Sequence, residues 1–239
     1  MEAIKTVGLR KQYRDVLAVD DLNLEIKRGE LFALLGINGA GKTTVINMLS
    51  CLIKPTSGDA FLQGKSICRD GEAVKSMIAL SPQETAIAPG LTVYENLALF
   101  CGIHGFSKEK QEKKIRELMG LLDLESVSRK KAGKLSGGWQ RRLSIAMALI
   151  CEPEVLFLDE PTLGLDVIAR SQLWELIRSL KGKITVILTT HYLEEAEALS
   201  DRIGIMAEGK LLICGTAEEI KEAAGTQSFE QAFVCLARR

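Results

Sequence analysis

The sequence feature that most limits the fold is the run 36–43, Gly-Ile-Asn-Gly-Ala-Gly-Lys-Thr, which fits the pattern GxxxxGK[ST]. An apolar run over 31–35 precedes this loop, and apolar residues at helical spacing follow it over 45–53. Glycines in such a loop let backbone N–H groups turn inward around a phosphate, and the next helix presents its positive N-terminal end to the same group. The run therefore predicts a P-loop protein that binds a nucleotide.

The P-loop also predicts roles for single residues. We expect Lys42 to contact the β- and γ-phosphates of the nucleotide and the Thr43 hydroxyl to ligate Mg²⁺. The residues expected to surround the nucleotide are Gly36, Asn38, Gly39, Ala40, Gly41, Lys42, Thr43 and Thr44.

The order of the remaining patterns predicts an α/β fold with a mainly parallel sheet, an antiparallel β region and an inserted helical subdomain. Period-2 alternation over 17–26 and strands at 155–158 and 184–188 indicate sheet. A helix that ends at about 180, a second helix at 194–199 and hairpins around 58–67 and 209 complete the pattern. Helical patterns fill 93–103, 108–122 and 136–151. We expect one domain over 1–239, with an α/β core at 1–83 and 151–239 and a helical subdomain at 84–150. From about 216 we expect one short helix and a tail.

Two carboxylates, Asp159 and Glu160, end the apolar strand at 155–158. Parallel sheets place their chemistry at the carboxyl ends of strands, so this pair should lie beside the P-loop. Asp159 is expected to bind Mg²⁺, and Glu160 to act as the general base that polarises an attacking water.

A second anion-binding helix start is predicted at Leu135-Ser136-Gly137-Gly138, where Ser136 is a suitable N-cap and the two glycines leave the helix start open. A single ATP bound within one chain would not be expected to contact both helix starts of that chain. Two chains packed head to tail would use both, because each ATP would lie between the P-loop of one chain and the Ser136 loop of the other.

These motifs together resemble the ABC ATPase family over nearly the whole chain, and the Leu-Ser-Gly-Gly run resembles its signature loop. The resemblance implies that Tyr13 stacks on adenine and that Gln83, in the Q-loop, contacts Mg²⁺ and the attacking water. It implies that Asp166, in the D-loop 161–166, contacts the other subunit and that His191 contacts the γ-phosphate. The implied cofactors are ATP and Mg²⁺, and the implied catalytic residues are Glu160, His191 and Gln83.

The chain departs from the usual family pattern at Trp139, Leu163 and Ile37, where Gln, Ser and Pro are common. None of these changes removes a phosphate ligand. Together with Arg-Arg-Leu at 141–143 and Val-Tyr-Glu-Asn-Leu at 93–97, they resemble the branch that exports drugs, antibiotics and lipids.

The resemblance also implies partners and a location. Expected partners are a second ATPase subunit, as a homodimer or heterodimer, and a separate transmembrane permease. The first residues predict no signal peptide, and no run approaches the ~20 apolar residues that span a bilayer. The expected location is therefore cytoplasmic, peripheral on the inner face of the cell membrane. The apolar loop 85–89 is expected to line the groove for a helix of the permease.

Three other classes of protein share parts of this pattern. A GTPase would need an NKxD element, which the sequence lacks. A soluble ABC-type ATPase acting on nucleic acid or ribosomes remains the alternative, but 31 basic and 31 acidic residues give no overall attraction to nucleic acid. A module that binds ATP without turnover is disfavoured by Glu160 and His191. The six cysteines, none in a CxxC pair, are interpreted as small buried residues in a reducing compartment.

Overall fold

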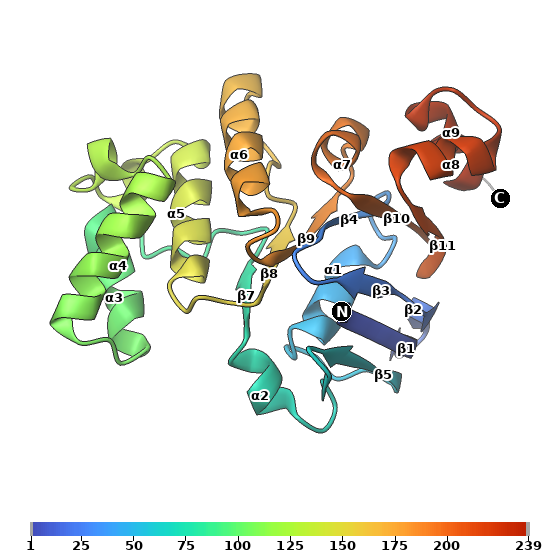
Figure 1. The fold of residues 1–239 in the computed structure, drawn as a ribbon, viewed down its shortest axis with the longest axis horizontal. Helices are drawn as coiled ribbons and strands as arrows, with labels where there is room; N and C mark the ends of the chain where they lie inside the picture. The colour runs from blue at the N-terminus through green and yellow to red at the C-terminus, as the bar shows by residue number, and fades with distance from the viewer. Residues whose placement is uncertain (1, 238–239) are drawn as a thin grey trace.

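The computed structural model describes residues 2–237 and confirms the predicted α/β class (Figure 1). Its central six-stranded sheet has the order β11-β10-β4-β9-β8-β7. Neighbouring strands from β10 to β7 are parallel, and β11 pairs with β10 in the antiparallel sense. The strands are β4 (Leu31–Leu35), β7 (Ile78–Ser81), β8 (Val155–Asp159), β9 (Thr185–Thr190), β10 (Arg202–Ala207) and β11 (Lys210–Gly215).

A second, antiparallel sheet contains the first strands of the chain in the order β2-β1-β5-β6, with β3 also paired to β1. Helix α1 (Lys42–Leu49), which follows the P-loop, contacts both β2 of this sheet and β8 of the central sheet. The loop is therefore fixed between the two sheets. The strands are β1 (Glu2–Tyr13), β2 (Val16–Leu22), β3 (Glu25–Lys27), β5 (Ser57–Leu62) and β6 (Lys65–Ser66).

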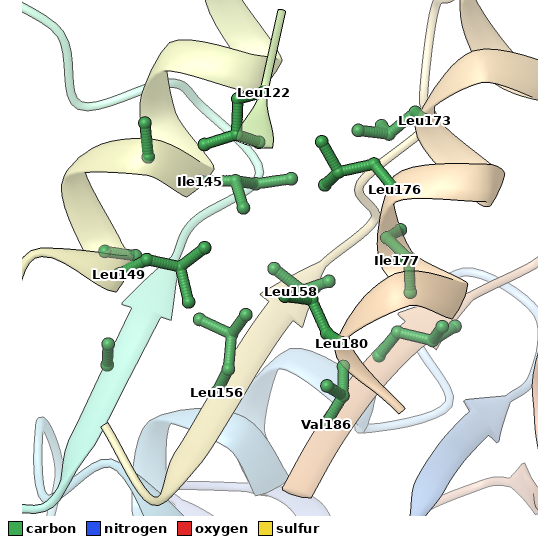
Figure 2. Packing of buried hydrophobic residues seen from close by; sticks show 14 of the residues in the cluster. Leu122, Ile145, Leu149, Leu156, Leu158, Leu173, Leu176, Ile177, Leu180 and Val186 are labelled. Atoms are coloured by element: carbon green, nitrogen blue, oxygen red, sulfur yellow. The ribbon is translucent and has the colours of Figure 1, made fainter. Parts of the chain in front are cut away.

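Alternate residues of the central strands enter two different cores, as the period of a strand requires. In β8, Leu156 and Leu158 pack with α5 (Gly137–Leu149) and α6 (Val167–Leu180) on one face (Figure 2). Phe157 points to the opposite face and packs with residues of α1 and the antiparallel sheet. Because both faces are covered, β8 is apolar throughout and ends in charge only at Asp159.

The segment between β7 and β8 is helical, with α3 (Val93–Ile103), α4 (Lys108–Leu121) and α5, and short 3₁₀ turns at Glu125–Val127 and Ala132–Lys134. A capping box between Thr92 and Glu95 begins α3. Helix α5 contacts α3 and α4 on one side and β7 and α6 on the other. It therefore joins the helical segment to the sheet.

Several local predictions were incomplete or wrong. Helix α2 (Gly71–Lys75) and strand β7 were not predicted, because their runs are too short to show a period. The tail predicted after 216 is wrong, because α8 (Ala217–Ala224) is followed by a second helix, α9 (Phe229–Ala237). The cysteines are not uniformly buried: Cys101 is, whereas Cys68 is exposed. Between residues 2 and 237, no helix combines the length and the apolar character needed to cross a membrane.

Candidate functional site

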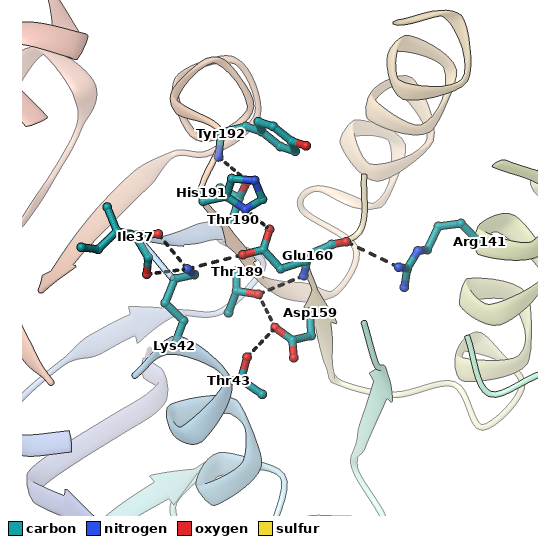
Figure 3. Close-up of polar contacts among 11 residues, drawn as sticks. Ile37, Lys42, Thr43, Arg141, Asp159, Glu160, Thr189, Thr190, His191 and Tyr192 are labelled. Atoms are coloured by element: carbon teal, nitrogen blue, oxygen red, sulfur yellow. Dashed lines mark hydrogen bonds and ion pairs between the residues drawn. The ribbon is translucent and has the colours of Figure 1, made fainter. Parts of the chain in front are cut away.

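The site lies at the carboxyl edge of the central sheet, where β4, β8 and β9 end side by side. Leu35 is in register with Thr190, and Asp159 with Thr189. The P-loop follows β4, Glu160 follows β8, and His191 follows β9, so the parallel topology brings these three segments together (Figure 3). A pocket of about 570 Å³ opens here. Its lining includes Asn38 to Thr44 of the loop, Gln83, Glu160, Leu163 and His191.

The glycines of the P-loop are required by close backbone contacts. A Cβ atom on Gly36 would lie 2.4 Å from the Met206 carbonyl oxygen, and one on Gly41 would lie 2.3 Å from that of Ala18. Gly41 also has φ of +101°, which side-chain-bearing residues rarely adopt. Only glycine therefore fits at these two positions, and α1 begins directly after Gly41.

Lys42 lies at the centre of the loop and is only 5% exposed. Its ammonium group donates to the carbonyl oxygens of Gly36 at 2.7 Å and Ile37 at 3.3 Å. It also pairs with Oε1 of Glu160 at 3.4 Å. This places a buried positive charge where the glycine loop turns inward.

The Glu160 carboxylate bridges two other site residues. Oε1 faces Lys42, and Oε2 lies 2.8 Å from Nδ1 of His191. Its backbone has φ of 47°, an uncommon conformation for a residue other than glycine. The backbone N–H of Glu160 donates to the Thr189 hydroxyl at 3.0 Å, which fixes the residue despite this strain.

Asp159 faces the opposite side of the strand end, toward α1. Its Oδ1 accepts hydrogen bonds from the hydroxyls of Thr189 at 2.5 Å and Thr43 at 3.3 Å. A carboxylate beside a threonine hydroxyl is the type of oxygen donor set that suits Mg²⁺. The two residues predicted from different motifs to bind the metal are therefore neighbours. Thr43 and Gln83 line the pocket, whereas Asp159 lies behind Thr43, outside the lining.

Gly36 and the predicted residues outside the P-loop and the strand ends are not part of the lining of this pocket. Tyr13 ends β1, is 43% exposed and has the Lys11 ammonium 5.0 Å from its ring centre. Ser136 is exposed at the start of α5, and its side chain makes no capping hydrogen bond. Asp166 caps α6 by accepting from the Ala169 N–H at 2.9 Å. The residues that were predicted for an opposite subunit, including Gly137 and Gly138, are thus separate from the chain's own P-loop.

Sequence reasoning missed two buried residues of the site. Thr189 is fully buried and joins Asp159 to the backbone of Glu160. The threonine pair that ends the apolar run 185–190 was its only signal. Glu195, on α7 (Leu193–Leu199), is also fully buried and accepts from the Trp174 indole N–H at 3.1 Å. Burial is the main cause that raises the pKa of Glu195.

Fold and site together define a P-loop protein of the nucleotide-binding type. The family model described as "ABC transporter" matches residues 19–163. The daunorubicin resistance ATP-binding protein DrrA3 of Streptomyces coeruleorubidus is 43% identical over 93% of the chain and 71% of its own length. The chain belongs to the ABC transporter family, as the sequence resemblance predicted, and is an ATPase of that family.

Other similar proteins extend the comparison. Human phospholipid-transporting ATPase ABCA3 is 41% identical over 93% of the chain, which spans only 13% of that protein. A dimeric post-hydrolysis state of the ATP-binding cassette MJ0796, bound to ADP and Pi, has a TM-score of 0.80 with 28% identity, covering 89% of this chain and 98% of that one. CbiO1 from Clostridium perfringens, part of the transporter complex cbiONQ, has a TM-score of 0.85 with 29% identity, covering 92% and 91%.

The buried carboxyl of Glu195 predicts a pH-dependent stability. Because its pKa is raised in the folded state, the unfolded chain loses this proton first as the pH rises above the ordinary value of 4.5. Folding stability from this group is therefore lost as the pH rises from 4.5 through the raised pKa of the folded state. Glu195→Gln removes the ionisation and keeps an acceptor for Trp174. The Tm of the variant minus that of the wild type should therefore increase as the pH is raised from 4.5 to 7.5. Thermal denaturation across that range measures the difference.

The matched control is Glu194→Gln, which changes the exposed neighbour on the same helix. Its Tm difference from the wild type should stay constant with pH. A Glu195→Gln difference that also stayed constant would show that burial does not raise the pKa of this carboxyl.

Proposed function

We propose that the pocket binds MgATP and that Glu160 orients the water that attacks the γ-phosphate. The observation that supports this most strongly is the Glu160 carboxylate, which contacts both Lys42 and His191 at the wall of the pocket. In this proposal Lys42 transfers its hydrogen bonds from loop carbonyls to the phosphates. Glu160 then polarises water, and His191 contacts the γ-phosphate from the end of β9.

The metal ligands in this proposal are Thr43, Asp159 and Gln83. When bound, Mg²⁺ would neutralise charge on the phosphate oxygens. Thr189 positions the Asp159 carboxylate through its 2.5 Å hydrogen bond. Tyr13, exposed at the end of β1, is proposed to stack on adenine.

We further propose that the working site is shared between two chains, whether identical or paralogous. Ser136, Gly137 and Gly138 lie outside the chain's own pocket, and Ser136 has no capping bond to compete with a phosphate. Near the D-loop residue Asp166, Val167 is 77% exposed and Ile168 is 72% exposed, which is unusual for apolar side chains without a partner. The dimeric cassette MJ0796 gives a precedent for such pairing.

At the level of domains, the proposal is a single ATPase domain with the α/β core at 1–83 and 151–239 and the helical subdomain at 84–150. The packing of α5 against both parts supports a division in which this helix transmits movement between them.

The partner proposed for this ATPase is a separate permease. The ATPase would bind it at the cytoplasmic face of the membrane, and the proposed direction of transport is export. DrrA3 is named as a drug-resistance protein, and CbiO1 is part of a transporter complex. Docking is proposed at the loop 85–89, where Ala86 is exposed and the Asn96 side chain fixes Ala88 through hydrogen bonds of 2.8 and 3.1 Å. Balanced charge gives the nucleic-acid alternative no comparable support.

The role of Glu160 predicts the behaviour of Glu160→Gln. Glutamine keeps the size of the side chain but cannot act as a base, so ATP hydrolysis should fall by about 10²-fold or more. ATP binding should persist, and a closed dimer should accumulate with MgATP. Phosphate release and size-exclusion chromatography measure the two effects.

Glu175→Gln is the control for this change, because Glu175 is an exposed residue of α6 outside the pocket. It should hydrolyse ATP at the wild-type rate. Turnover by Glu160→Gln that matched this control would exclude Glu160 as the base.

The docking proposal predicts that Ala86→Glu releases the chain from membranes. A charge placed in an apolar contact must be desolvated, which costs several times more than a surface change. Sedimentation of membranes from cells producing the tagged chain should recover less of this variant than of Lys65→Glu, which changes an exposed residue of β6. The ATPase rate of both purified variants should stay near wild type. Equal membrane recovery of both variants would exclude this docking site.

A further inference from the structure

Arg141 is a buried cation, and its motif, Arg-Arg-Leu at 141–143, does not explain what the side chain does. It lies one and a half turns after Ser136 on α5 and is only 5% exposed. Its guanidinium donates to the carbonyl oxygens of Pro82 and Gln83, each at 2.6 Å. It also donates to the carbonyl oxygen of Glu160 at 3.5 Å (Figure 3). One side chain thus contacts the backbone of the Q-loop and the backbone of Glu160, the proposed base.

The partners of Arg141 are unusual for a buried charge. Within residues 2–237, no carboxylate lies close enough to form an ion pair with it. Asp159 and Glu195 act on its charge only from a longer distance, and burial lowers its pKa. Removing a cation from water costs several kcal/mol unless it is paired. Three carbonyl contacts offset this cost less well than an ion pair would, so packing of the helix alone does not account for a charge at this position.

The neighbouring Arg142 shows what a structural contact looks like on the same helix. It is similarly buried, but it donates to the Leu122 carbonyl at 3.2 Å, the Asp123 carboxylate at 3.0 Å and the Gln172 side chain at 2.9 Å. None of these three partners lines the nucleotide pocket. Arg142 therefore joins α5 to its packing neighbours, whereas Arg141 joins α5 to the site.

We propose that Arg141 is a positioning residue that couples the start of α5 to the Glu160 and Gln83 backbones of the same chain. This proposal depends on the shared site proposed above. A phosphate that binds at Ser136 belongs to the ATP held by the partner's P-loop. Any shift of α5 on that binding moves the Arg141 guanidinium, and with it the carbonyls of Gln83 and Glu160. ATP at one site thereby aligns the base at the other.

The strained backbone of Glu160 makes this coupling effective. A residue with φ of 47° relaxes toward ordinary conformations when its contacts loosen. The Thr189 hydroxyl accepts from its N–H, and its carbonyl accepts from the Leu163 N–H at 3.2 Å and from the Arg141 guanidinium at 3.5 Å. Because misplacement by about 1 Å can reduce a rate by about 10²-fold, a small movement at Arg141 is enough to switch hydrolysis.

The test compares Arg141→Lys and Arg141→Gln with Arg142→Lys, using the full chain with MgATP. We expect both Arg141 variants to bind ATP within about twofold of wild type while kcat falls by about 10- to 100-fold. The Hill coefficient for ATP should fall toward one. Arg142→Lys should lower Tm but keep kcat and the Hill coefficient within about twofold of wild type. Lysine retains the charge at 141, but its single ammonium nitrogen cannot reproduce the fork of the guanidinium, which reaches Pro82 and Gln83 from two different nitrogens, so this variant isolates the geometry.

Two results would overturn the proposal. One is wild-type kcat and Hill coefficient in both Arg141 variants. The other is a loss of kcat that tracks Tm equally in the Arg141 and Arg142 variants, which would assign Arg141 a structural role only. Glu160→Gln, measured in parallel, separates this failure from failure of the proposed function. If Glu160→Gln is inactive while Arg141→Lys is normal, only the coupling role is lost.

Discussion

The contact on which the rest of the structure depends is the Glu160 carboxylate held between the Lys42 ammonium and the His191 ring. Its three members come from segments far apart in the sequence, and each follows a different parallel strand. The register of β4, β8 and β9 makes their meeting unavoidable, because it aligns the carboxyl ends of the strands. The two cores on either face of the sheet then serve one purpose, which is to fix those strand ends relative to α1 and α5.

This arrangement stores unfavourable energy at the edge where the chemistry occurs. Lys42 and Arg141 are buried cations, Glu195 is a buried acid, and Glu160 has a left-handed backbone. Each feature would lower stability in an ordinary core. In the shared site proposed above they have a common use: they provide charge and geometry that improve when a polyanionic nucleotide and a second chain complete that site. The exposed apolar side chains at the start of α6 are a further unfavourable feature, which contact with a second chain would relieve.

The sequence predicted the parts of the site that rest on local chemistry. The P-loop and the acidic pair are each defined by a few consecutive residues, whereas His191 was implied by the family resemblance; the pocket contains Lys42, Glu160 and His191 together. Thr189, Arg141 and Glu195 could not be predicted in the same way, because their importance comes from contacts with residues distant in the chain. The missed helix α9 is different: Phe229, Ala232, Phe233 and Leu236 have helical spacing, so its signal was present and was misjudged.

The central claim, a site composed of unlike surfaces from two chains, is tested most directly by mixing two inactive variants. Lys42→Ala disables the P-loop, and Ser136→Glu places a negative charge where the partner's phosphate should bind. A mixed dimer contains one site with an intact Lys42 from one chain and an intact Ser136 from the other. The account predicts that ATP hydrolysis by the mixture rises well above the sum of the two separate variants. If the mixture shows only that sum while mixed dimers are demonstrably present, each site lies within one chain and the account is contradicted.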